Sequence, residues 1–348
     1  MLIMLSSPAI LVGKTLDELQ NLLNQWGEPA YRAEQMAQWL YRRPVAHVED
    51  MSNIPAKLRA QLMEETILHP SKIETVRHSR DKTRKYLLSL GDGELIESVF
   101  IPETHRTTVC ISTQAGCGMG CTFCATGIKG LARNLTTGEM VDQILQVALD
   151  VGRLPGNVVF MGMGEPLANY DELIKTIEVI NAPWGLNIGI RQLTVSTCGL
   201  VPGIRRLGVE GLGLTLAVSL HAADNGKRSQ IMPVNRSYGV NELMEALREY
   251  VQNTSRRVTI EYALMAGFND GEADARKLCG LLRGLLCHVN LIPVNPVRGG
   301  LHTKPRFSEI ERFQAELQRG GLTVSIRKER GEDIEAACGQ LKGEWEER

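Results

Sequence analysis

The sequence Cys117-Gly-Met-Gly-Cys121-Thr-Phe-Cys124 contains three cysteines in a C-x3-C-x2-C spacing. Cysteine thiolates bind iron–sulfur clusters, and a four-iron cluster with only three protein thiolates keeps one iron open to a small molecule. Gly118 and Gly120 allow the backbone to turn tightly around such a cluster. Structural zinc normally takes four ligands, and the chain has no second C-x2-C or H-x3-H pair. The spacing therefore predicts a 4Fe-4S cluster on Cys117, Cys121 and Cys124, in preference to three cysteines that merely lie together.

From residue 107 onward, strand-like and helix-like segments alternate along the chain. Strands are predicted at residues 107–112, 157–161, 192–196, 214–220, 257–264 and 288–293, with helices at 136–151, 171–180, 203–207, 243–250 and 273–285. Such alternation indicates parallel strands joined by crossover helices. Six strand–helix units predict an α/β fold with a partial (β/α)6 barrel, open on one side. The chemistry of such a barrel takes place at the C-terminal ends of its strands.

The chain outside this barrel is divided into smaller parts. Residues 1–75 are expected to form a small helical accessory domain, whose first helix starts at the capping-box pattern Thr15-Leu-Asp-Glu18. Residues 76–103 predict a short β-hairpin extension that leads into the barrel. We place the barrel at residues 104–300 and a C-terminal extension, with a last helix and a last strand, at residues 301–348.

The composition limits the class of protein. With 43% hydrophobic residues, 23% charged residues and a net charge of −1, the chain is typical of soluble globular proteins. It has no run of about 18 apolar residues, so no membrane span is expected. The N-terminus Met1–Pro8 lacks a basic region and contains two serines, which makes it a poor signal peptide. Eight unevenly spaced cysteines favour a reducing compartment. We therefore expect a cytoplasmic protein.

Polar residues and glycines follow the ends of several predicted strands. Glu165, in the stretch Met161-Gly-Met-Gly-Glu-Pro166, can accept a hydrogen bond from a cationic amine. Alternation along a strand places Ser219 and His221 on one face, with Leu220 turned away. Alone, the stretch around Glu165 is about as typical of a plain turn, and a single serine or asparagine at a strand end is usually a turn or cap residue. The candidate ligand-binding residues at this edge are Gly164, Glu165, Ser196, Ser219, His221 and Asn295.

Together these features resemble the radical S-adenosylmethionine superfamily, whose signature is C-x3-C-x2-C. The wider context, from Cys110-Ile-Ser-Thr-Gln-Ala-Gly-Cys117 to Cys124-Ala-Thr-Gly127, is similar to one branch of it. That branch is the dual-specificity ribosomal RNA and transfer RNA methyltransferases, which modify C2 of adenine. The resemblance covers nearly the whole chain. It implies a 4Fe-4S cluster and S-adenosylmethionine as cofactors, the latter bound by the residues at the strand ends.

The resemblance also implies catalytic roles for Cys338, Cys110 and Glu97. One S-adenosylmethionine methylates Cys338, and a second is cleaved to a 5′-deoxyadenosyl radical that activates this methyl group for addition to C2. Cys110 then helps to resolve the covalent adduct, leaving a transient Cys110–Cys338 disulfide, while Glu97 lies near the target adenine. By composition alone, a free cysteine is more often a buried core residue. That interpretation is kept for Cys198, Cys279 and Cys287.

The implied partners are 23S ribosomal RNA, transfer RNA and a flavodoxin- or ferredoxin-type reductant, with the protein as a monomer. Candidate phosphate contacts are the basic strip Lys72–Lys85 and the patch Arg298, Lys304 and Arg306. The strip fits a solvated strand edge about equally well. Three alternatives stay open: a related enzyme that methylates C8 of such an adenine, an iron–sulfur electron carrier or RNA-binding module, and a zinc-binding RNA-recognition protein.

Overall fold

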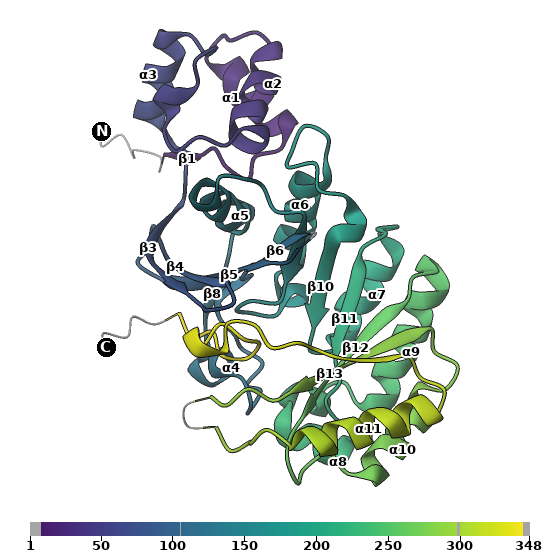
Figure 1. Cartoon of the computed structure of the whole chain (residues 1–348). Helices are drawn as coiled ribbons and strands as arrows, with labels where there is room; N and C mark the ends of the chain where they lie inside the picture. The colour runs from purple at the N-terminus through teal and green to yellow at the C-terminus, as the bar shows by residue number, and fades with distance from the viewer. Residues whose placement is uncertain (1–7, 105, 298–299, 344–348) are drawn as a thin grey trace, which may run out of the picture.

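The computed structural model describes residues 8–104, 106–297 and 300–343. A ten-stranded mixed sheet runs through it in the order β14-β13-β12-β11-β10-β9-β6-β5-β4-β3 (Figure 1). Its parallel strands are β6 (Thr107–Cys110), β9 (Asn157–Phe160), β10 (Leu193–Thr197), β11 (Thr215–Ser219), β12 (Val258–Leu264), β13 (Cys287–Pro293) and β14 (Val324–Ile326). The six strands predicted for the barrel are all present and pair in parallel, and β14 extends the sheet. The partial barrel is therefore confirmed, and its sheet continues past residue 300.

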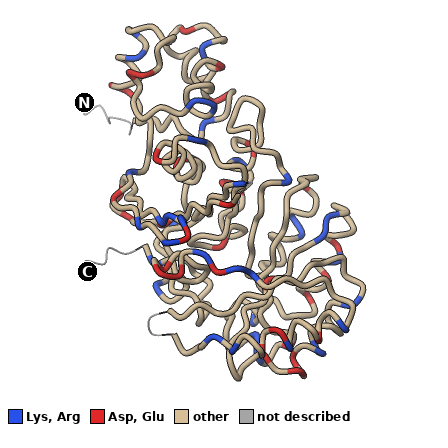
Figure 2. The backbone as a smooth tube through the Cα atoms, in the orientation of Figure 1, with Lys and Arg blue, Asp and Glu red and all other residues tan. Residues whose placement is uncertain are grey.

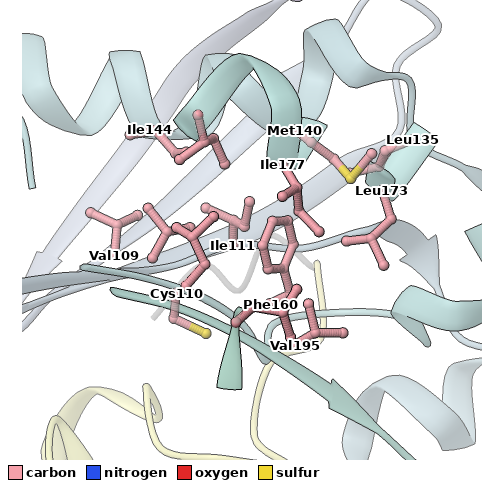
Figure 3. Close-up of a cluster of buried hydrophobic side chains, with 14 of the residues drawn as sticks. Val109, Cys110, Ile111, Leu135, Met140, Ile144, Phe160, Leu173, Ile177 and Val195 are labelled. Atoms are coloured by element: carbon pink, nitrogen blue, oxygen red, sulfur yellow. The ribbon is translucent and has the colours of Figure 1, made fainter. Parts of the chain in front are cut away.

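Helices cover the outer face of the parallel strands (Figure 1). They are α5 (Thr137–Val151), α6 (Tyr170–Asn181), α7 (Val201–Val209), α9 (Val240–Thr254), α10 (Glu272–Leu282) and α11 (Phe307–Arg319). Figure 3 shows how β6 and the residue after it contribute to the core: Val109 of β6 and the following Ile111 gather with Ile144 of α5 and Ile177 of α6. Burial of each such side chain is worth about 1.5–3 kcal/mol. No helix in the described part of the chain is long and apolar enough to cross a membrane.

Three antiparallel strands extend the barrel sheet at its other edge. They are β3 (Ser71–His78), β4 (Arg84–Leu90) and β5 (Leu95–Pro102), and β5 pairs with β6. The predicted hairpin corresponds to β4 and β5. The strand β3 pairs with β4 and crosses residue 75, where the sequence suggested a boundary between the helical domain and the hairpin. The strand β3 is largely polar and only partly buried, so the first part of the basic strip forms a solvated strand edge, one of the two interpretations that the sequence left open.

The N-terminal domain is helical, as predicted. It contains α1 (Leu16–Gln25), α2 (Tyr31–Ala37) and α3 (Ala56–Glu65), and the capping box of Thr15 and Glu18 is present at the start of α1. Several short elements were not predicted, because a few residues carry too little periodicity. These are β1 (Ala9–Ile10), β2 (Thr66–Ile67), β7 (Gln114–Gly116), β8 (Leu131–Asn134), α4 (Ala125–Lys129) and α8 (Asn225–Ile231).

A buried carboxylate connects the N-terminal domain to the barrel. Asp142 of α5 has no exposed surface, and its Oδ2 accepts hydrogen bonds from Ser71 N (3.0 Å) and Ser71 Oγ (2.6 Å). Its Oδ1 lies 2.5 Å from His69 Nδ1, and His69 Nε2 lies 2.9 Å from the carbonyl oxygen of Val45. Both ring nitrogens therefore face acceptors, which favours the imidazolium. Burial lowers the pKa of His69, but hydrogen bonding to Asp142 and its charge outweigh this, and the pKa is raised.

The His69–Asp142 contact predicts a stability that depends on pH. The pKa of His69 in the folded protein lies above its ordinary value of 6.5. Its contribution is therefore fully present below that ordinary value and is lost as the pH rises through the folded pKa. Urea unfolding between about pH 6 and pH 9 should show this loss in the wild type and a flatter profile in His69→Gln. His47→Gln, at an exposed histidine, is the control. Identical profiles for His69→Gln and the wild type would contradict the prediction.

The C-terminal segment, residues 327–343, crosses the barrel after β14 (Figure 1, yellow). At its start, Arg327 N donates to Leu291 O of β13 (2.8 Å). At its end, Leu341 O accepts a hydrogen bond from Thr126 Oγ1 of α4 (2.6 Å). Between these anchors, Ala125 N donates to Gly339 O (2.8 Å). These bonds hold Cys338 against the C-terminal ends of the barrel strands.

Candidate active site and cofactor-binding site

A cavity of about 170 Å³, here called the cluster cavity, lies at the C-terminal ends of the parallel strands. All three predicted cluster ligands and all six predicted ligand-binding residues line it. They are Cys117, Cys121, Cys124, Gly164, Glu165, Ser196, Ser219, His221 and Asn295. Cys338 lines the same cavity although it is more than 200 positions away from the cysteine loop in the sequence. The structure therefore brings together the two groups of residues that the sequence could only suggest separately.

The cysteine loop is fixed by backbone hydrogen bonds on both sides. Cys117 N donates to Gly130 O (2.8 Å), and Thr122 N donates to Ile231 O at the end of α8 (3.1 Å). Gly120 has a φ of +64°, a conformation that favours glycine, as expected for a tight turn. Gly118 does not fit its expected role, because a Cβ there would meet only ordinary contacts at 3.7 Å.

The three thiols share a buried, electronegative environment. Burial and the neighbouring thiols raise the pKa of Cys121 above its ordinary value, and burial raises that of Cys117 to about 11. Binding of thiolates therefore requires a cation that compensates for their charge. Among the described residues, no three side chains gather around a point that a single metal ion could occupy. A four-iron cluster does not require the three thiolates to meet at one point, because it binds each thiolate through a different iron atom.

Glu165 lies in the wall of the cluster cavity and is 3% exposed. Its carboxylate accepts hydrogen bonds from Leu167 N (3.0 Å) and Cys198 N (2.7 Å). Burial raises its pKa, and these two amide bonds oppose the rise. The bonds also fix the carboxylate rigidly, and each oxygen retains a lone pair that can accept a further hydrogen bond. Glu165 is thus suited to receive an ammonium group in the cavity.

The surroundings of His221 define its backbone conformation, its ring contacts and its protonation state. Its φ of +57° is rare for a residue with a side chain, and its Nδ1 accepts a hydrogen bond from Ala263 N (2.9 Å). The ring of Phe123 lies against it edge-on, with the two ring centroids 4.8 Å apart. Burial, assisted by the nearby charge of Arg228, lowers the pKa of His221 to about 3. The neutral ring therefore carries its proton on Nε2 and can act as a hydrogen-bond donor.

Asn295 provides the clearest sign that the cavity is built for a ligand. Its Nδ2 donates to Cys338 O (3.1 Å), while its buried Oδ1 has no hydrogen-bond partner in the described part of the protein. Buried polar atoms are rarely left without a partner. The ammonium and ribose hydroxyl groups of S-adenosylmethionine are donors that could bind such an acceptor. The residues present therefore fit a cluster with S-adenosylmethionine beside it.

A buried arginine that sequence reasoning missed supports the strand ends. Arg228 of α8 has no exposed surface, and its guanidinium donates only to neutral acceptors in the described structure. These are Leu220 O (3.1 Å), Asn235 Oδ1 (3.0 Å), Cys198 O (2.6 Å) and Ser219 O (3.3 Å). Its side chain thus joins the ends of β10 and β11 from behind the cavity. An arginine in a polar helix looks like a surface residue in the sequence, so no signal could have revealed it.

A smaller cavity of about 50 Å³, the middle cavity, lies beside the cluster cavity and contains both predicted catalytic cysteines. Figure 3 shows the sulfur of Cys110 pointing away from the apolar side chains of Val109 and Ile111. Burial, together with the nearby Cys338, raises the pKa of Cys110 to about 12. All eight cysteines are free in the structure, so the expected Cys110–Cys338 disulfide finds no support in it. Arg327, which was not predicted, also lines this cavity.

Glu97 lies beneath the C-terminal segment and lines neither cavity. Its carboxylate forms a buried ion pair with Lys85 (3.0 Å) and accepts hydrogen bonds from the backbone amides of Lys342 (2.6 Å) and Gly343 (3.3 Å). The structure thus shows Glu97 as an anchor of the segment that carries Cys338. Its expected place near the target adenine stays a prediction.

The two basic regions are engaged with acids in several places. Lys85 is buried against Glu97, so its expected role as a phosphate contact was wrong. Arg84 pairs with Asp150 (2.7 Å), and Lys304 pairs with Glu329 (2.6 Å). Figure 2 shows positive and negative residues interleaved along much of the chain. Arg298, part of the second patch, lies outside the described residues.

Three cluster thiols and a lined cavity at the ends of parallel strands define a radical S-adenosylmethionine enzyme. Residues 111–279 match the radical SAM superfamily, and residues 10–68 match the ribosomal RNA large subunit methyltransferase N-terminal domain. The chain is also 46% identical over 336 residues to the probable dual-specificity RNA methyltransferase RlmN of Alkaliphilus metalliredigens, with 96% of this chain and 95% of that protein covered. The chain therefore belongs to the RlmN family of dual-specificity RNA methyltransferases.

Further comparisons agree with this assignment. The protein of the same description from Pelotomaculum thermopropionicum is 49% identical over 331 residues, which cover 94% of this chain and 90% of that one. The crystal structure of a radical SAM methyltransferase from Sphaerobacter thermophilus superimposes with a TM-score of 0.94 at 45% identity. The superposition covers 97% of this chain and all of that one. The likeness thus includes the N-terminal domain and the barrel together.

Proposed function

We infer that the protein methylates C2 of adenine in 23S ribosomal RNA and in transfer RNA. The single observation that carries this inference is the position of Cys338 in the same cavity as the three cluster cysteines. An electron carrier or an RNA-binding module needs no such thiol, and its cluster would be expected to have four protein ligands. The dual-specificity RNA methyltransferases to which the chain is similar also favour an RNA substrate.

In the proposed reaction, the cofactors would supply the reactive groups and the protein would bind and orient them. When bound, the cluster and S-adenosylmethionine supply a methyl group and a 5′-deoxyadenosyl radical, which the poorly nucleophilic C2 carbon requires. Cys117, Cys121 and Cys124 would hold the cluster. Glu165 would accept a hydrogen bond from the amino group of S-adenosylmethionine, and Asn295 Oδ1 would accept one from another of its donors. Gly164, Ser196, Ser219 and His221 complete the wall of this binding site.

The catalytic cysteines act on the RNA side of the site. Cys338 would accept the methyl group on its sulfur and later carry it to the adenine. Arg327 lies near Cys338 and Cys110, and its pKa is raised by the charge of Cys338 in spite of its own burial. The reactive form of a cysteine is the thiolate, and Arg327 is a cation that lines both cavities to which Cys338 belongs. Cys110 would then release the RNA from Cys338, and Glu97 would assist at the adenine.

The further requirements of the reaction are those of a cytoplasmic RNA-modifying enzyme. A flavodoxin- or ferredoxin-type protein would deliver the electron, and the protein would act as a monomer. The adenine must leave its stack to reach a buried thiol, so loops and other single-stranded regions are the natural targets.

The test is the identity of the methylated base. Anaerobically reconstituted and reduced protein is incubated with S-adenosylmethionine and RNA, and the adenines are then analysed by mass spectrometry. We expect 2-methyladenine in both ribosomal and transfer RNA. 8-Methyladenine would assign the protein to the related C8 activity. Neither product, with the cluster and reductant verified, would refute the proposed function.

A further inference from the structure

Below the middle cavity, the barrel contains a third and larger cavity, here called the polar chamber, of about 490 Å³. Its strand residues continue the rows that line the upper cavities. On β6, Thr108 lies in the chamber and Cys110 in the middle cavity; on β10, Thr194 lies in the chamber and Ser196 in the cluster cavity. Because alternate residues of a strand share a face, these rows are the inner face of the barrel. The chamber is its N-terminal half.

The composition of this inner face is unusual for a barrel. Barrel interiors are normally filled by bulky aliphatic side chains. Here Thr108, Asn157, Thr194 and Thr215 supply hydroxyl and amide groups from four neighbouring strands, and they leave a chamber of a size typical of ligand sites, about 300–1,000 Å³. A polar chamber of this kind lacks the stabilisation that buried aliphatic side chains would give. None of the residues proposed to hold the cofactors lines it.

The rim of the chamber is basic. Arg106, Arg191, Lys328 and Arg330 line it, against the single acid Glu103. Arg106 pairs with Glu103, and Arg330 comes no closer than 3.9 Å to Asp81. Arg191 and Lys328 form no ion pair within the described residues, and both are exposed. Figure 2 shows the Lys and Arg positions of the C-terminal segment where it crosses the barrel. The cations of the rim thus outnumber its one acid, Glu103, whose pKa is lowered by the neighbouring Arg106, Arg330 and Lys328.

The chamber leads toward the catalytic cysteines. It shares Ile101, Arg327, Lys328 and Arg330 as walls with the middle cavity, which in turn contains Cys110 and Cys338. Arg327 lines the chamber, the middle cavity and the cluster cavity. The chamber is therefore a direct neighbour of the cavity that contains Cys338, whereas it borders the cluster cavity at Arg327 alone.

We propose that the polar chamber is the RNA entrance of the enzyme, through which the target nucleotide reaches Cys338. Arg191 and Lys328 bind the phosphates that flank this nucleotide, and the threonine and asparagine side chains contact its sugar and the edges of its base. Phosphate contacts of this kind position a nucleic acid without reading its sequence. Arg327 contacts the base as it passes toward the cysteines. This proposal rests on the proposed function, because it assumes an RNA substrate.

The first test removes the two unpaired cations of the rim. Binding of the reconstituted protein to an RNA hairpin with an adenine in its loop is measured over a series of salt concentrations. For Arg191→Gln/Lys328→Gln, we expect about tenfold weaker binding at low salt, and a salt slope reduced by about 1.4, since each single-stranded phosphate contact contributes about 0.7. Methylation of Cys338 in the absence of RNA and the absorption of the cluster should remain unchanged.

The matched control is Arg248→Gln/Arg312→Gln, which removes two exposed cations from the outer helices α9 and α11. It should bind the hairpin as the wild type does. Equal affinity and salt slope for the rim variant and the wild type would overturn the proposal, as would an equal loss in the control.

The second test fills the chamber. Thr194→Phe places an aromatic ring in it, and RNA methylation should be lost while methylation of Cys338 without RNA is retained. Full RNA methylation by this variant would overturn the proposal. Failure of the proposed function gives a different result: the wild type would then methylate no adenine, whereas the rim variant would still lose RNA affinity.

Discussion

Replacement of Cys338 by alanine should abolish RNA methylation and leave the cofactor site intact. The thiol is the group that receives the methyl, and no other cysteine occupies its position between the cluster cavity and the middle cavity. The contact of Asn295 with this residue uses the backbone carbonyl of Cys338, which alanine retains. The small change at a partly exposed side chain should therefore not disturb the segment. The result expected is no 2-methyladenine by mass spectrometry.

Cofactor readouts separate this result from simple misfolding. Iron content, the absorption of the cluster and binding of S-adenosylmethionine by Cys338→Ala should match those of the wild type. Cys287→Ala is the control, since Cys287 starts β13 and lines neither the cluster cavity nor the middle cavity. RNA methylation by Cys338→Ala at the rate of that control would show that the methyl group takes another route.

Replacement of Cys110 by alanine should stop turnover at a later stage and accumulate a covalent protein–RNA adduct. In the adduct, the sulfur of Cys338 is joined through the transferred carbon to the RNA. Attack of the Cys110 thiolate on this sulfur forms an S–S bond, and the electrons of the broken S–C bond go to the carbon. Both residues line the middle cavity, so the two thiols border the same space. Alanine cannot carry it out, and the adduct should persist.

The adduct is detected as a band of RNA-linked protein on a denaturing gel and located by mass spectrometry on the peptide that contains Cys338. Its formation should require reduced cluster and S-adenosylmethionine. The double variant Cys110→Ala/Cys338→Ala serves as the negative control. Normal turnover of Cys110→Ala without any adduct would remove Cys110 from this role. The pKa of Cys110, about 12, also means that its deprotonation must be assisted when the RNA is in place.

Much of the cluster cavity could be predicted from the sequence, because its residues lie at places that the chain marks locally. Cys117, Cys121 and Cys124 share a short loop, while Ser219 ends a recognisable strand and His221 follows it. The position of Cys338 was reached only by resemblance to a family, since its neighbours in space are distant in sequence. The ion pair of Lys85 with Glu97 could not be foreseen for the same reason. A lysine in a basic stretch looks exposed until the fold buries it.

Other parts could not be predicted because they depend on tertiary contacts alone. Arg228 has its function only through carbonyl groups of three different segments. Arg327 lines the middle cavity because it comes directly after β14, the strand that ends beside this cavity. The sequence of β3 fitted a solvated strand edge and a phosphate-contacting strip about equally well, and only its pairing with β4 decides for the strand. In each case the role of the residue depends on partners that only the fold brings next to it.

The glycines of the C-terminal segment have a consequence for how this sequence can evolve. Gly331, Gly339 and Gly343 all have positive φ values, of +63°, +85° and +61°. A Cβ on Gly343 would lie 2.3 Å from Leu95 O, and one on Gly331 would lie 2.7 Å from the Cβ of Ala336. These positions are thus restricted by backbone geometry, independently of any chemistry at Cys338. A descendant that lost the cysteine and its activity would still be under selection to keep these glycines for as long as it had to fold.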